Sequence, residues 1–82
     1  MTEWTYDRRV GVIPEWEKDS KIITQQDETS ITIRANTQAL RSLANHLLRL
    51  ADKNVPVGAH IHYDDHGELE NGSVELIIDK LA

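Results

Sequence analysis

A single amphipathic helix pattern limits the fold of this chain more than any other feature. It lies in residues 36–56, NTQALRSLANHLLRLADKNVP. Asn36 or Thr37 can cap its start by accepting a hydrogen bond from a free backbone N–H, and Asn54 and Pro56 favour its end. The apolar residues recur at steps of three and four, which is typical of one helical stripe; they are Leu40, Leu43, Ala44, Leu47, Leu50 and Ala51. A lone helix must bury such a stripe against another element, so we expect a sheet beneath it.

The rest of the chain has patterns typical of strands. Residues 31–35 and 57–64 alternate between apolar and polar side chains, as a half-buried strand does. Similar patterns occupy the segments at residues 3–13, 20–26 and 73–81. The predicted order is β-β-β-α-β-β. We therefore expect an α+β fold with a single small sheet of four to five strands, mixed or antiparallel, and the helix packed on one face. The strand before the helix would pair in parallel with a strand after it through a right-handed crossover.

Size and charge exclude several classes of protein. The chain has 82 residues, which predicts one domain over residues 1–82 with a modest core. It has no cysteine, so disulfides and cysteine zinc sites are excluded. Its net charge of −5 argues against direct nucleic-acid binding. It has no apolar run near the roughly 20 residues that span a bilayer and no signal-peptide pattern, so we expect no membrane contact and an intracellular location.

The segment AHIHYDDHGELENGSVELIID, residues 59–79, holds three histidines and six carboxylates without a lysine or arginine. His60 and His62 share the outward face of a predicted strand, where two imidazoles can bind one metal ion with Asp64 or His66 as a third ligand. The same pair can respond to mild acid, because two protonated imidazoles repel each other. A polar strand face in contact with water explains the same residues without a metal ion. Because firm third and fourth ligands are lacking, no metal and no cofactor are predicted.

Catalytic motifs are missing. The chain has no nucleophile elbow, no zinc-protease motif, no phosphate loop and no dinucleotide fingerprint. Ser73, His66 and Asp65 lie on or beside one turn, which is a poor scaffold for a catalytic triad. His46 lies beside the helical stripe, where we expect it at the rim or on the surface. The sequence therefore predicts a protein that is not an enzyme.

The C-terminal part of the chain resembles a known family. It combines a short strand at residues 31–35, the Leu-rich helix at 40–51, the strand with His60 and His62, and the return LENGSVEL at 69–76. In this it is similar to the small immunity proteins of bacterial polymorphic-toxin systems, in particular the immunity protein family numbered thirty-two. The resemblance covers about residues 30 to 80. It implies a cytoplasmic, non-catalytic protein that binds and blocks a cognate toxin, often a nuclease or a deaminase.

Such a toxin is basic where it holds nucleic acid, so an acidic protein surface can occupy that site in place of the nucleic acid. The acidic residues expected to contribute to partner binding are Asp64, Asp65, Glu68, Glu70 and Glu75. Trp16 is either an interface anchor or a side chain folded over one end of the sheet, the second being favoured. Ile77, apolar on an otherwise polar strand face, instead indicates a structural module that dimerises through the sheet. A monomer and a homodimer both remain open.

Overall fold

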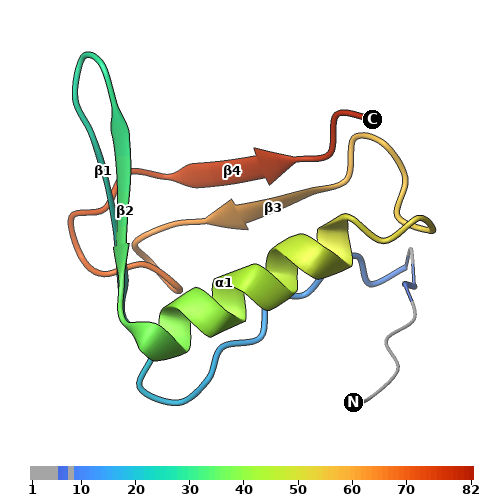
Figure 1. The fold of residues 1–82 in the computed structure, drawn as a ribbon, viewed down its shortest axis with the longest axis horizontal. Helices are drawn as coiled ribbons and strands as arrows, with labels where there is room; N and C mark the ends of the chain where they lie inside the picture. Colours follow the sequence, from blue (N-terminus) through green and yellow to red (C-terminus); the bar gives the residue numbers. More distant parts are fainter. Residues whose placement is uncertain (1–5, 8) are drawn as a thin grey trace.

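A computed structural model of the protein describes residues 6–7 and 9–82. It contains the strands β1 (Ile22–Gln26) and β2 (Ile31–Ala35), the helix α1 (Thr37–Leu50), and the strands β3 (His60–Tyr63) and β4 (Leu76–Asp79). Helix α1 runs along β3 and β4, and the β1–β2 hairpin rises across one end of that layer (Figure 1). The predicted α+β class, with one helix on β structure, is confirmed.

The predicted single sheet is wrong. The described strands form two antiparallel sheets of two strands each, β1 with β2 and β3 with β4. The expected parallel pairing of the strand before the helix with a later strand is also wrong, since β2 pairs with β1. Residues 9–13 of the expected first strand form a turn followed by irregular chain, while residues 3–5 and 8 of that prediction lie outside the described part.

Two backbone hydrogen bonds nevertheless join the hairpins. The N–H of Glu70 donates to the carbonyl of Ile22 over 2.7 Å, and the N–H of Val74 donates to that of Thr24 over 3.1 Å. Between these two contacts the chain turns at Gly72, whose positive φ of 88° suits a residue without a Cβ. That turn interrupts the ladder, because an irregular segment cannot pair residue by residue with a strand. This is the physical reason why one expected sheet becomes two.

Helix α1 starts where one of the two predicted caps places it. The side-chain oxygen of Asn36 accepts from the N–H of Ala39 over 3.0 Å, so Asn36 rather than Thr37 is the cap. The same oxygen accepts from the N–H of Lys21 over 3.1 Å, which fixes the start of α1 against the chain entering β1. The Asn36 side chain therefore satisfies a free N–H at the start of the helix and also positions the helix relative to the hairpin.

The buried face of α1 is rotated from the predicted stripe. Leu40 and Leu47 are 54% and 41% exposed, and Ala44 and Ala51 are exposed as well. The helix buries a partly polar set instead, namely Ala39, Ser42, Leu43, His46 and Leu50. The cause is the segment before β1, because the Ser42 hydroxyl accepts from the Glu17 N–H over 2.9 Å and His46 bonds to the Glu15 carbonyl. That segment covers a helix face which the apolar pattern alone assigns to solvent.

The core collects residues from both hairpins, the helix and the loops. Its buried apolar members are Ile22, Ala39, Leu43, Leu50, Val55, Ile61, Tyr63 and Leu69. Ile61 and Tyr63 alternate with His60 and His62 along β3, which confirms the predicted inward and outward faces of that strand. In the described part of the chain, no helix has the length and apolar character needed to cross a bilayer.

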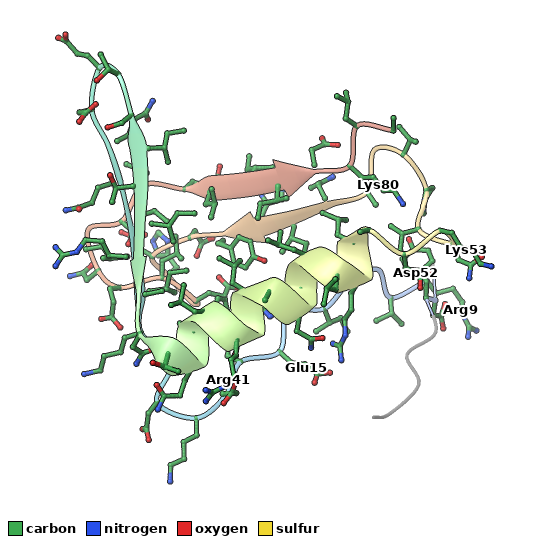
Figure 2. The ribbon with its side chains drawn as sticks, viewed as in Figure 1. Arg9, Glu15, Arg41, Asp52, Lys53 and Lys80 are labelled. Atoms are coloured by element: carbon green, nitrogen blue, oxygen red, sulfur yellow. The ribbon has the colours of Figure 1, made fainter. Side chains whose placement is uncertain are left out.

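Lys80 closes the end of the molecule where α1 ends, near Asp52 and Lys53 (Figure 2). Its ammonium donates to the carbonyls of Asp52 and Val55, each over 2.8 Å. Because both bonds are partly buried and charge-assisted, we expect Lys80→Met to lower the free energy of unfolding by about 1–3 kcal/mol. Urea unfolding followed by Trp fluorescence measures this, with Lys53→Met as the control. An equal effect of the two substitutions would contradict this role of Lys80.

Candidate functional site

The outward face of the β3–β4 hairpin carries the two strand histidines. The rings of His60 and His62 lie 4.9 Å apart in an edge-to-face arrangement, and His60 is opposite Asp79 in the register. His62 Nδ1 lies 3.7 Å from a carboxylate oxygen of Glu75. The face is polar and open to water, as the alternation of residues 57–64 predicts.

His60, His62 and Asp64, the residues considered as metal ligands, are not arranged around one point. The carboxylate of Asp64 accepts from the backbone N–H of His66 over 3.0 Å, which commits it to the turn after β3. Across residues 6–7 and 9–82, no three His, Asp or Glu side chains are placed to hold one metal ion. The geometry therefore supplies no support for the His60, His62 and Asp64 set.

Four of the five predicted partner-binding carboxylates lie in one segment, the acidic turn, which we define as residues 64–70. Leu69 anchors this turn because its side chain is buried and its N–H donates to the Asp64 carbonyl over 2.9 Å. Glu68 accepts weakly from the Asp64 N–H over 3.4 Å, and Asp65 lies 3.2 Å from His66 Nδ1. In this turn Asp64, Asp65 and Glu68 are half-buried and Glu70 is exposed.

Glu75, the fifth predicted residue, lies apart from the acidic turn. It follows Val74, whose N–H bonds to β1, and its half-exposed carboxylate reaches His62 on the outward face of the sheet. The predicted acidic set is therefore split between the acidic turn and the β3–β4 face, on either side of the Gly72 turn.

A buried polar cluster that the sequence did not predict lies beneath these surfaces. His46 is fully buried, so its expected position at the rim is wrong. Its Nε2 lies 2.7 Å from the Glu15 carbonyl, and its Nδ1 lies 3.0 Å from the Tyr63 hydroxyl. Since a carbonyl can only accept, Nε2 carries a hydrogen. In the neutral ring Nδ1 then accepts from the Tyr63 hydroxyl, and both nitrogens have a hydrogen-bond partner.

The surroundings of His46 keep it neutral. Burial lowers its pKa from 6.5, more than the bond to the Glu15 carbonyl raises it. Burial also raises the pKa of Tyr63 to about 12, so its hydroxyl stays protonated and able to donate. Trp16 packs edge-on against His46 at 4.7 Å and against Tyr63 at 5.8 Å between ring centroids, so its partly buried ring lies against the core. The spacing of residues 39, 43, 46 and 50 was the signal that could have placed His46 inside.

A surface cleft of about 340 Å³ lies between residues 15–17, in the segment before β1, and helix α1. Its charged groups satisfy each other, because Arg41 donates two bonds of 2.8 Å to the carboxylate of Glu17. Those bonds hold the pKa of Glu17 below its ordinary value. Figure 2 shows Arg41 and Glu15 on this side of α1, away from the β3–β4 outward face. The cleft thus has an ion pair in its lining and contains no residue of the predicted site.

These features define a small α+β protein with an exposed histidine pair on β3 and a partly exposed acidic turn. The chain belongs to the immunity protein 32 family, whose family model, described as Immunity protein 32, matches residues 30–81, more than half of the chain. This confirms the resemblance seen in the sequence. No curated protein and no solved structure matches the chain. The matched range starts after β1, so the segment that carries Trp16 and Ile22 lies outside it.

Proposed function

We propose that the chain is a non-catalytic immunity protein that binds a cognate toxin and blocks it. The observation that carries this proposal is the match of residues 30–81 to the immunity protein 32 model. Immunity proteins of this kind neutralise a toxin by binding, so the chain needs no reaction of its own. Its site of action is the cytoplasm, where the toxin meets its target.

The charge distribution supports a nuclease or deaminase as the toxin. Residues 54–79 contain no lysine or arginine, and the acidic turn projects Glu70 into solvent. A toxin that holds nucleic acid has a basic groove, which attracts an acidic protein over distances of about 10 Å at 0.1 M salt. The acidic turn then occludes the groove, with Asp64, Asp65, Glu68 and Glu70 as its contributors and Glu75 beside them.

If the chain is an immunity protein, the gene directly upstream of its own gene should encode a toxin, and the test uses the toxic domain of that protein. That domain should kill a host on expression, and co-expression of the chain should restore growth. Purified, the two proteins should form a stable complex. A toxin domain that is neither bound nor inhibited would overturn the proposed function.

The contribution of the acidic turn has its own prediction. We expect Asp65→Lys with Glu70→Lys to slow association with the toxin domain by about tenfold at low salt and to flatten its salt dependence, since exposed charges act mainly on the on-rate. Stopped-flow mixing at several salt concentrations measures both effects. The matched control is Glu15→Lys with Glu28→Lys, which makes the same change of net charge at exposed positions elsewhere. An unchanged on-rate, or equal slowing by both variants, would remove the acidic turn from the mechanism.

A further inference from the structure

A second surface feature combines exposed apolar side chains with carboxylates. It is a notch of about 250 Å³ between the β1–β2 hairpin and the start of β4, lined by Thr24, Gln26, Ile31, Val74, Leu76 and Ile77 together with Glu75. We call it the hairpin notch. Its position follows from the fold, because the hairpin rises across the end of the β3–β4 layer (Figure 1).

The hairpin notch exposes apolar surface that the fold leaves in contact with water. Ile31 is 65% exposed, Ile77 is 49% exposed and Val74 is 39% exposed. Ile31 is opposite Gln26 in the hairpin, on the strand face where Thr24 is fully buried. The inner face of the hairpin therefore begins in the core and continues into solvent. Protein interfaces combine an apolar centre with a polar rim, and the contiguous exposed side chains of Ile31, Val74 and Ile77 beside polar residues have that arrangement.

The charges around the notch select its occupant. Glu75 lines it, and Asp79 lies two residues beyond Ile77 on the same outward face of β4. The lining residues include no lysine or arginine, and Arg34 is opposite Ile23, on the other face of the hairpin from Ile31. A cleft between α1 and β4 is also largely apolar, but Lys80 lines it. Of these two recesses, the hairpin notch is the one whose lining has the same sign of charge as the acidic turn.

We propose that the hairpin notch is the anchoring site for the cognate toxin, and that it accepts an apolar side chain flanked by lysine or arginine. This deepens the proposed function and rests on it. The acidic turn speeds the encounter, and the notch holds the complex. Interface energy is concentrated in a few desolvated apolar contacts, while exposed charges chiefly change the on-rate.

The test is the double variant Ile31→Ser with Ile77→Ser, whose binding kinetics are measured with the same toxin domain that tests the proposed function. Because both side chains are largely exposed, the variant should fold, and circular dichroism with thermal unfolding checks this. We expect its dissociation rate to rise by about tenfold or more with an on-rate close to that of the wild type. The matched control is Leu48→Ser with Val57→Ser, two exposed apolar residues away from the notch, which should leave both rates unchanged.

The outcomes separate the two proposals. A wild-type chain that does not bind the toxin domain overturns the proposed function and the notch with it. A wild-type complex whose dissociation rate is unaffected by the notch variant, or affected equally by the control, overturns the notch alone. Sedimentation of the chain by itself tests whether a second copy of the chain occupies the notch. A homodimer that the notch variant dissociates would show that it does, and would also overturn the inference.

Discussion

A chain reduced to residues 30–82, which includes the whole family match, is expected to remain unfolded. The truncation removes β1, which lies between β2 and residues 70–74 and bonds to both. It also removes Ile22 and Thr24, both fully buried, and the Trp16 ring. Loss of one such apolar core side chain costs about 2–5 kcal/mol, and a domain of this size is stabilised by roughly 4–12 kcal/mol in total. Loss of the whole strand therefore exceeds the available stability.

Far-UV circular dichroism and amide proton dispersion measure this result. The control is the full chain with Ile22→Ala, which keeps the backbone of β1 and should stay folded with about 2–4 kcal/mol less stability. A synthetic peptide of residues 6–29 should restore structure to the truncated chain, because it returns the missing strand. A cooperatively folded 30–82 chain would show that the core does not need β1.

The part of the fold that the sequence predicted correctly rests on local patterns. The helix begins at Thr37 after an asparagine cap, and β2 and β3 lie where alternation places them. The sheet arrangement was wrong because it depends on contacts between distant residues, such as the bonds of Glu70 and Val74 to β1. No periodicity in either segment encodes that pairing. The turn at Gly72, which divides the sheet, acts only once the two hairpins meet.

The site shows the same limit. Alternation along β3 correctly placed His60 and His62 on an open face, and the run of acidic residues located a turn. Alternation could not show that Glu75 lines the hairpin notch, since that depends on how the β1–β2 hairpin meets the start of β4. His46 was misplaced for a related reason. Counting only apolar residues assigns Leu40 and Leu47 to the core, whereas a histidine with two buried partners is the better fit to the face that the N-terminal segment covers.

The burial of His46 has a consequence for stability at mild acid. Burial lowers its pKa in the folded chain below 6.5, while the unfolded chain titrates near 6.5. The unfolded state therefore binds the proton first as the pH falls, so the contribution of His46 to stability is complete above pH 6.5 and is lost below it. The charges of Glu15 and Glu68 oppose this lowering and that of Arg49 reinforces it, burial being the largest cause. We expect the free energy of unfolding to fall by up to about 1.4 kcal/mol between pH 7.5 and 5.5 through this residue.

Urea unfolding at the two pH values measures that fall, and two variants assign it. His46→Gln should lower stability at pH 7.5 by about 1–3 kcal/mol, because it disturbs the buried bonds to Tyr63 and Glu15, and it should remove most of the pH dependence. His60→Gln, at an exposed imidazole on β3, should retain the pH dependence of the wild type. If the fall in the free energy of unfolding between pH 7.5 and 5.5 persists in His46→Gln and vanishes in His60→Gln, it arises from the exposed histidines of β3 and not from the buried His46 ring. A neutral His46 between Tyr63 and the Glu15 carbonyl requires the opposite result, because protonation would place a second hydrogen against the Tyr63 hydroxyl inside the core.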